Sequence, residues 1–133
     1  DRIGEIARAR KIPIFGNGDV SSHADAMAKI DKYGVAGVYI GRGSFGNPWL
    51  FSGRDRSQLS YHERLPVILQ HMDYMSDFYG DALAAVLMRK QLHQYLKDLP
   101  LWAEIKTEMF SGKSAAALKG TLLRMSERSE LVA

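Results

Sequence analysis

Two glycine-containing turns, at residues 16–19 and 41–43, have the composition of a phosphate-binding site. Each turn follows a short apolar run and stands where a strand would end and a helix would begin. Glycine lets the backbone approach a ligand closely, and free N–H groups at the start of a helix attract anions. The two turns together predict an anion site, although ordinary strand-to-helix turns have the same residue types.

The residues expected to contact the ligand are Asn17, Gly18, Asp19, Gly41 and Arg42. Arg42 can form a charge-assisted hydrogen bond with a phosphate oxygen. Asn17 and Asp19 offer polar groups to the sugar or ring edge of a ligand. The two glycines leave the backbone N–H groups accessible.

Residues 41–46 also match the G-x-G-x-x-G pattern of dinucleotide-binding proteins. That pattern requires a helix that opens at the loop, followed by another strand with an acidic residue at its end. Here Asn47 and Pro48 follow at once, and Pro48 suits the first position of a short helix. Because no further strand is predicted, we do not assign a dinucleotide-binding fold.

The apolar run at residues 12–15 is short and rich in branched side chains, which favours a buried strand. Residues 35–40 form a second strand-like run. Pro13 is tolerated because it stands near the start of its strand. Before and between these runs lie helical patterns. Residues 1–43 are therefore predicted to form a helix, a strand, a helix and a strand.

The helix between the two strands has recognisable end signals. Ser21 or Ser22 can cap its start, and Gly34 can cap its end. A connection of this length suits a crossover helix between parallel strands of an α/β fold. In a (β/α)₈ barrel, the loops after the last two strands often form a phosphate site. We therefore predict the last two β/α units of a TIM barrel.

The second half of the chain is predicted to be all-α. A polar linker at residues 53–60 leads to a capping box, in which Glu63 follows Ser60 by three residues. Four amphipathic helices follow, and their pattern predicts a small antiparallel bundle. Breaks between the helices are expected at Gly80, Pro100 and Gly112.

The second helix of the bundle has a basic face. Its members are Arg89, Lys90, His93 and Lys97, which project within an arc of about 100° on a helical wheel. Such a stripe suits a nucleic-acid backbone, and a simply solvated face is the alternative. The stripe is therefore a candidate RNA-binding surface.

Several aromatic residues are assigned to packing. Tyr95 lies on the apolar side of the second helix, so packing is favoured over stacking on a base. Trp102 and Phe110 are expected in the core of the bundle. Trp49 and Phe51 are expected to cover the end of the barrel.

Composition excludes several classes of site. The chain has no cysteine, which excludes disulfides and thiolate metal sites and is compatible with a cytoplasmic protein. His62 and His71 have no second ligand at a useful spacing, so no metal site is predicted. No apolar run reaches the ~18 residues of a membrane span. The net charge is +3, and residues 61–133 carry nine basic and nine acidic side chains, so bulk charge does not indicate nucleic acid.

The sequence resembles the C-terminal part of bacterial FMN-dependent tRNA-dihydrouridine synthases. Ile-Pro-Ile-Phe-Gly-Asn-Gly-Asp at 12–19 and Gly-Val-Tyr-Ile-Gly-Arg-Gly-Ser-Phe-Gly-Asn-Pro-Trp-Leu-Phe at 37–51 resemble the last two strands and loops of that family's barrel. Met88-Arg89-Lys90 with Tyr95 resembles the motif of its helical domain. The resemblance implies a flavoenzyme that reduces uridine to dihydrouridine in tRNA, with NADPH as reductant.

The resemblance also assigns roles along the chain. It implies that Asn17, Gly18, Asp19, Gly41 and Arg42 bind FMN. Residues 1–52 would be the end of the barrel and residues 61–133 a tRNA-binding domain. The general acid of the family is a cysteine on an earlier loop, so no catalytic residue is assigned, and we expect the chain alone to be inactive.

Two other functions stay open from the residues. One is a different FMN-dependent barrel oxidoreductase that acts on a small molecule, and the other is a non-catalytic RNA-binding module. The chain begins with Asp1 within a helical pattern, so we expect a piece of a longer protein. Exposed strand edges in such a piece favour self-association.

Overall fold

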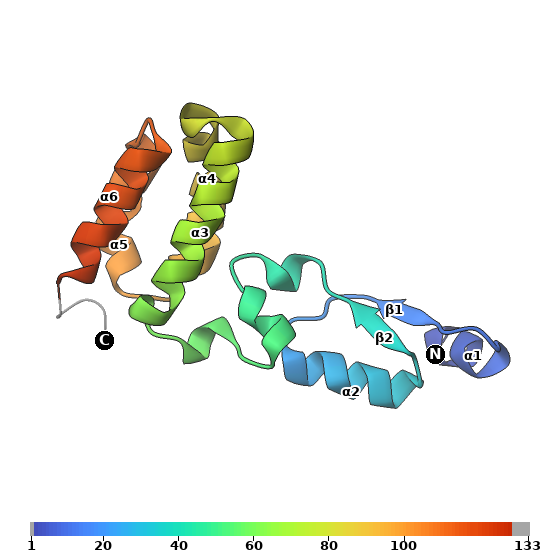
Figure 1. Ribbon diagram of the computed structural model, residues 1–133. Helices are drawn as coiled ribbons and strands as arrows, with labels where there is room; N and C mark the ends of the chain where they lie inside the picture. Colours follow the sequence, from blue (N-terminus) through green and yellow to red (C-terminus); the bar gives the residue numbers. More distant parts are fainter. Residues whose placement is uncertain (1, 129–133) are drawn as a thin grey trace. The chain divides into compact units, whose positions relative to one another are not determined.

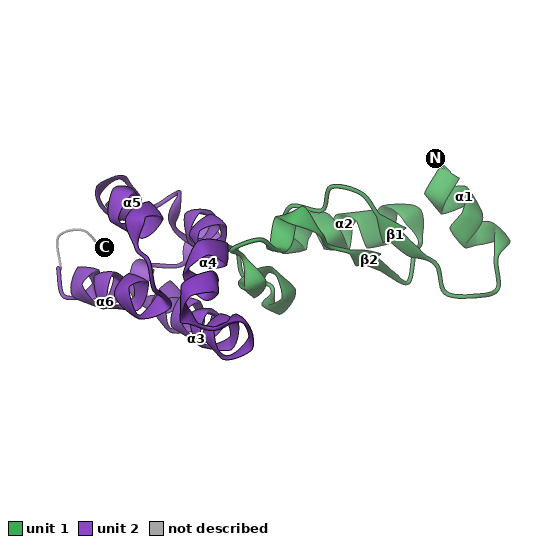
Figure 2. Ribbon diagram, turned by 90° about the horizontal axis from the view of Figure 1, so that it is seen from above, with its two compact units in different colours: residues 1–55 green, residues 56–133 purple. Residues whose placement is uncertain are grey.

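The computed structural model describes residues 2–128, which form two compact units. The first unit ends at Asp55 and the second begins at Arg56 (Figure 2). This boundary lies within the predicted linker at residues 53–60. Helices and strands occur together only in the first unit, whereas the second contains helices alone.

The first unit is built around a two-stranded parallel sheet (Figure 1). Its elements are α1 (Arg2–Ala9), β1 (Phe15–Asn17), α2 (His23–Tyr33), β2 (Gly37–Tyr39) and the 3₁₀ turns η1 (Arg42–Ser44) and η2 (Pro48–Ser52). In the sheet Phe15 pairs with Gly37, and Asn17 pairs with Tyr39. The predicted order of elements and the parallel pairing are confirmed.

The first strand lies later than predicted. It covers Phe15–Asn17 rather than residues 12–15, and the first backbone bond next to it runs from the Ala36 N–H to the Ile14 carbonyl at 2.8 Å. Pro13 has no N–H, so the ladder begins beyond it. The prediction of a buried strand is wrong for Phe15, which is 55% exposed. Its neighbour in the sheet, Tyr39, is 65% exposed as well, because only one face of the sheet is covered.

Helix α2 begins immediately after the first turn, and its ends are fixed by local hydrogen bonds. The Ser22 hydroxyl accepts from the Asp25 N–H at 3.1 Å, which makes Ser22 the N-cap. Gly34 adopts the left-handed conformation at φ 63° and donates its N–H to the Ile30 carbonyl. Both predicted caps are confirmed, and they set where the first turn meets the helix.

The second unit consists of four helices that pack on one another. They are α3 (Tyr61–Tyr79), α4 (Asp81–Leu96), α5 (Leu101–Ser111) and α6 (Ala115–Ser126), preceded by the 3₁₀ turn η3 (Arg56–Gln58). The capping box is confirmed, because Ser60 accepts from the Glu63 N–H and the Glu63 carboxylate accepts from the Ser60 N–H. Gly80 alone joins α3 to α4 as a hairpin.

The core of this unit is formed by apolar side chains from all four helices. Its fully buried members include Ile68, Met72, Met88, Leu92, Leu96, Leu101, Met109, Leu118 and Leu122. Trp102 and Tyr95 are buried as predicted. Phe110 is 51% exposed, so its assignment to the core is wrong. It follows the core residue Met109 by one position, which rotates it by about 100° away from the core.

Candidate functional site

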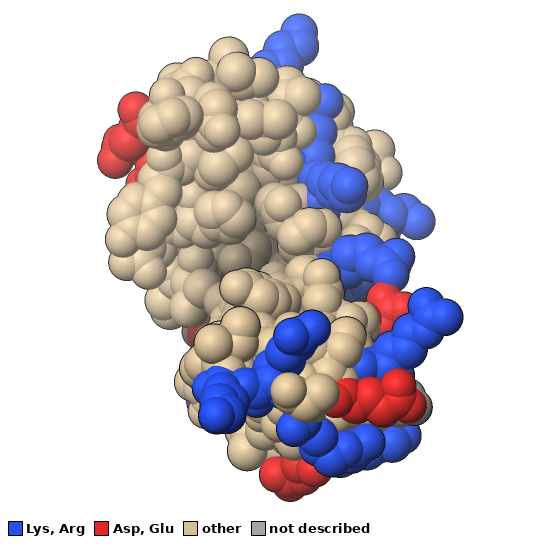
Figure 3. All heavy atoms as spheres, turned by 90° about the vertical axis from the view of Figure 1, so that its right-hand side faces the viewer, with Lys and Arg blue, Asp and Glu red and all other residues tan. Residues whose placement is uncertain are grey.

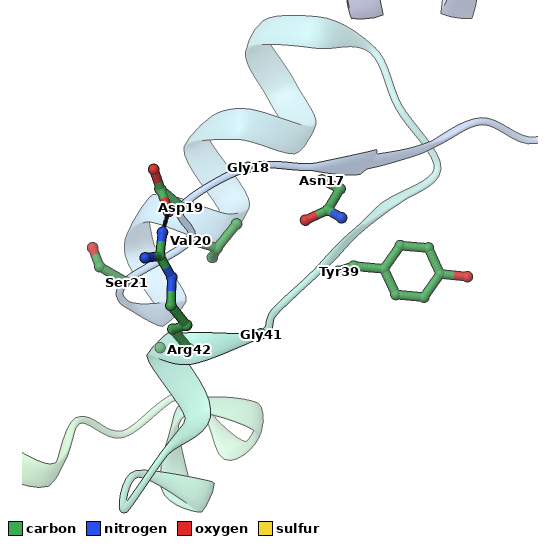
Figure 4. A pocket seen from close by; sticks show the side chains of 9 residues that line it. Asn17, Gly18, Asp19, Val20, Ser21, Tyr39, Gly41 and Arg42 are labelled. Atoms are coloured by element: carbon green, nitrogen blue, oxygen red, sulfur yellow. Dashed lines mark hydrogen bonds and ion pairs between the residues drawn. The ribbon is translucent and has the colours of Figure 1, made fainter. Parts of the chain in front are cut away.

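The two predicted turns lie against each other and form a pocket of about 490 Å³ (Figure 4). Residues 17–21 line it from the first turn, and residues 41–43 line it from the second, together with Tyr39 at the end of β2. The structure therefore brings all five predicted ligand residues to one site. It adds Val20, Ser21, Tyr39 and Gly43, of which only Gly43 belongs to a predicted glycine turn.

Close approach of the two turns depends on Gly43. A Cβ atom at this position would lie 2.2 Å from the carbonyl oxygen of Val20, far inside van der Waals contact. The obstructing atom belongs to the backbone and cannot rotate away. Gly43 is therefore the residue that lets the second turn rest directly on the first.

The backbone of the first turn has an unusual conformation. Gly18 has φ 151° and Asp19 has φ 38°, and Asp19 is the only non-glycine residue with positive φ in the described part of the chain. Aspartate tolerates the left-handed region better than most residues. The positive φ values turn the chain sharply between β1 and α2, so successive peptide groups border the pocket.

An ion pair crosses the pocket between the two turns. The Arg42 guanidinium donates to the Asp19 carboxylate at 2.5 Å, as the dashed line in Figure 4 shows. The two side chains are 83% and 84% exposed, so solvent screens their attraction. An incoming phosphate can therefore take the place of the carboxylate beside Arg42.

Lys29 and Asp25 on α2 hold the first turn from behind. Lys29 Nζ donates to the carbonyls of Gly18 at 3.1 Å and Asp19 at 3.0 Å, and to the Asp25 carboxylate at 2.9 Å. Asp25 also accepts from the Ser21 N–H at 3.1 Å. These hydrogen bonds, the one from Lys29 first, lower the pKa of Asp25.

Sequence reasoning did not single out Lys29. Its only local signal is the spacing of four residues from Asp25, which is typical of helical ion pairs in general. The contacts with the turn depend on the way α2 lies against β1. No local pattern could therefore have distinguished Lys29 from the neighbouring Lys32.

In the second unit, the predicted basic stripe on α4 divides into two kinds of residue. Lys90 and Lys97 are exposed, and Lys97 donates to the Gln94 side chain at 2.8 Å. Arg89 is half-buried and donates to the Gly112 carbonyl at 3.0 Å, so it ties α4 to the end of α5. The His93 ring lies 5.4 Å from the Trp102 ring.

A further group of cations surrounds α1. Arg2, Arg8, Arg10 and Lys11 are all exposed, and Glu5 is the one acidic residue among residues 2–11. Figure 3, seen from the α1 end of the molecule, shows basic side chains gathered there. A solvated charged surface explains this group sufficiently.

Residues 2–128 have neither a membrane-spanning helix nor a cluster of metal ligands. The described helices are all too short or too polar to cross a lipid bilayer. The same residues contain no cluster of three or more His, Cys, Asp or Glu side chains that could hold a metal ion. The pocket between the turns is therefore the principal candidate site.

The first unit thus has the features of a phosphate-binding end of an α/β protein, followed by a helical unit. Comparison with known families identifies the family of the chain. The family model described as dihydrouridine synthase matches residues 1–129, and the chain belongs to that family.

Individual relatives agree with this assignment. A probable tRNA-dihydrouridine synthase from Rickettsia conorii is 32% identical over 114 residues, which cover 80% of this chain and 34% of the relative. A tRNA-dihydrouridine synthase B from Pseudomonas putida is 36% identical over 109 residues, covering 75% and 32%. A probable synthase from Aquifex aeolicus is 28% identical over 135 residues, covering 99% and 43%. The chain therefore matches well under half the length of these relatives.

Proposed function

We propose that this chain is the FMN-phosphate-binding and tRNA-contacting part of a tRNA-dihydrouridine synthase. The pocket between the two turns is the observation that carries the proposal. When bound, reduced FMN supplies the hydride that reduces the C5–C6 double bond of uridine, and NADPH is the proposed reductant of the flavin. The membership of the chain in the dihydrouridine synthase family supports this choice of cofactor and substrate.

The residues of the pocket fit a phosphate group. Arg42 provides a cation at its mouth, and the left-handed backbone at Asp19 presents peptide groups rather than side chains. Because positions 41 and 43 are glycines, Arg42 contributes the one side chain that residues 41–43 present to the pocket. Asn17 lies at the end of β1 and is proposed to contact the sugar-like chain or ring of the flavin.

We also propose the place of each segment in a larger fold. Residues 1–52 correspond to the last two β/α units of a TIM barrel, residues 53–60 to a linker, and residues 61–133 to the tRNA-binding domain of a cytoplasmic enzyme. The outer edges of β1 and β2 have no strand partner within the described residues. Further barrel strands would pair there, and a second copy of this chain is the alternative occupant of those edges.

The proposed tRNA surface is the basic face of α4. Lys90 and Lys97 are exposed and suited to direct contact with phosphates. Arg89 and His93 belong to the same proposed surface, but their half-buried positions give them a second role in holding α5. Charge reversal at the two lysines therefore tests RNA contact without breaking helix packing.

The flavin site is tested by replacing Arg42 with glutamine in the 133-residue chain. We expect FMN to bind about tenfold more weakly, because one charge-assisted hydrogen bond to the phosphate is lost. Titration followed by flavin fluorescence measures the affinity, and riboflavin, which lacks the phosphate, should be unaffected. Arg10→Gln removes the same charge outside the pocket and serves as the control. If the wild-type chain binds FMN no better than riboflavin, the phosphate site is wrong.

The tRNA surface is tested with the double variant Lys90→Glu and Lys97→Glu. Binding of tRNA should weaken, and the slope of log K against log salt should fall by about 2, because about one phosphate contact is lost at each lysine. Lys106→Glu with Lys113→Glu is the matched control, since both lysines are exposed outside the predicted stripe. Equal losses in the two double variants would show a diffuse charge effect. Binding of tRNA without binding of FMN would instead favour a non-catalytic RNA-binding module.

A further inference from the structure

Lys29 determines which way two peptide groups of the first turn face. Its ammonium group accepts no hydrogen bond and donates to the carbonyl oxygens of both Gly18 and Asp19, at 3.1 and 3.0 Å. In a trans peptide the C=O and the following N–H point in opposite directions. All peptide bonds in the described residues are trans. The N–H groups of Asp19 and Val20 therefore point away from Lys29.

The phosphate pocket lies on the side of the turn opposite Lys29. Lys29 lines a separate cavity of about 160 Å³, which Ile3 and Tyr33 also border, and it does not line the pocket of about 490 Å³. Gly18 and Val20 border both spaces, so the turn separates them. The two N–H groups point away from Lys29, and both Asp19 and Val20 border the phosphate pocket.

These two N–H groups are available to a ligand. Neither the Asp19 nor the Val20 amide has a hydrogen-bond acceptor among residues 2–128. Backbone N–H groups in folded proteins nearly always have a hydrogen-bond partner. An anion in the pocket would satisfy both donors.

We propose that Lys29 is a positioning residue for phosphate recognition, holding two carbonyls back so that the Asp19 and Val20 amides face the ligand. The inference rests on the proposed phosphate site and deepens it. Asp25 completes the arrangement, because it binds Lys29 at 2.9 Å and the Ser21 amide at 3.1 Å. The Asp25 carboxylate thereby holds the Lys29 ammonium group in place, and Lys29 in turn holds the carbonyls of the first turn.

The test uses Lys29→Met, Lys29→Arg and Lys32→Met in the ¹³C,¹⁵N-labelled 133-residue chain. Lys32 lies on the same helix, is exposed, and contacts the Tyr33 ring rather than the turn, so it controls for lost charge. Without ligand, the Gly18 and Asp19 carbonyl ¹³C resonances should shift upfield in Lys29→Met but not in Lys32→Met. In Lys29→Arg, whose side chain can still donate to two carbonyls, these resonances should return to their wild-type positions.

The same variants are then titrated with FMN and with inorganic phosphate. Lys29→Met should bind both about tenfold more weakly than Lys32→Met, with partial recovery in Lys29→Arg, as expected when one well-oriented hydrogen bond to an anion is lost. The Asp19 and Val20 amide resonances of the wild type should move during the titration. Far-UV circular dichroism checks that each variant keeps its helices.

The possible outcomes separate the two hypotheses. If the wild type binds neither FMN nor phosphate, the phosphate site itself is refuted, and the role of Lys29 with it. If the wild type binds and Lys29→Met equals Lys32→Met in affinity and carbonyl shifts, the phosphate site stands and the role of Lys29 is overturned.

Discussion

Replacement of Arg64 by alanine should lower the free energy of unfolding of the helical unit by about 3 kcal/mol, the scale of leaving a cavity and losing several hydrogen bonds of a buried side chain. Arg64 is 1% exposed although it carries a full charge. Its Nε donates to the Leu59 carbonyl at 2.9 Å, and Nη1 donates to the Tyr95 carbonyl at 2.8 Å. Two bonds at 2.8 and 3.0 Å reach the Asp98 carboxylate. Alanine would leave a cavity and remove the hydrogen bonds that Arg64 donates to these two carbonyls and to the carboxylate.

The destabilisation by Arg64→Ala should be measured at a pH at which Asp98 is ionised. Burial alone would raise the pKa of Asp98, but hydrogen bonding and charge from Arg64, together with the charge of Arg56, lower it below its ordinary value. A lowered carboxyl pKa stabilises the fold above the unfolded-state pKa of about 4, and this contribution is lost as pH falls through the folded-state pKa. Urea denaturation at pH 7, followed by circular dichroism at 222 nm, therefore measures the full contribution.

Arg128→Ala is the control for Arg64→Ala. Arg128 is 59% exposed and lies 3.4 Å from Glu104, so its loss should change the stability by less than about 1 kcal/mol. Both variants remove one guanidinium that faces a carboxylate. Equal destabilisation by the two substitutions would contradict a structural role for the buried Arg64 network.

Replacement of Gly43 by alanine should weaken FMN binding by about a hundredfold, the scale of losing about two hydrogen bonds to a charged phosphate. The added Cβ would lie 2.2 Å from the Val20 carbonyl oxygen, so the two turns must separate. Separation moves Arg42 away from the amides of the first turn. Flavin fluorescence titration of the 133-residue chain measures the loss.

Gly37→Ala is a matched control in the same unit. Its added Cβ would lie 2.9 Å from the Phe15 ring, but that ring is 55% exposed and can rotate away. FMN affinity should therefore change little. A wild-type affinity in Gly43→Ala would falsify the close contact between the turns as a requirement for binding.

Much of this architecture follows from local sequence signals. Ser22 and Gly34 act as caps because their effects depend on the adjacent backbone alone, and Gly80 ends α3 for the same reason. The two glycine turns could be paired in advance because parallel strands bring their carboxyl ends to one edge of a sheet. The family resemblance chose the same turns independently.

Other features could not be predicted because they depend on tertiary packing. A helical wheel gives the direction in which Arg89 projects, but it does not show that the end of α5 lies there to accept a hydrogen bond. Phe110 has a large apolar side chain of the kind found in cores, yet the neighbouring Met109 occupies the core position. Lys29 acquires its role only when α2 packs behind the first turn.

The ion pair between Arg42 and Asp19 has a consequence for ligand choice. Arg42 Nη2 already donates to the Asp19 carboxylate at 2.5 Å, so an anion that binds through this nitrogen displaces a carboxylate of the same chain. The tethered carboxylate is present at a high effective concentration, so a free monovalent anion gains little from the exchange. A phosphate monoester carries close to two negative charges at neutral pH and more acceptor oxygens, so it competes on better terms. At the proposed phosphate site we therefore expect Asp19 to act as an internal competitor that favours anions of higher charge.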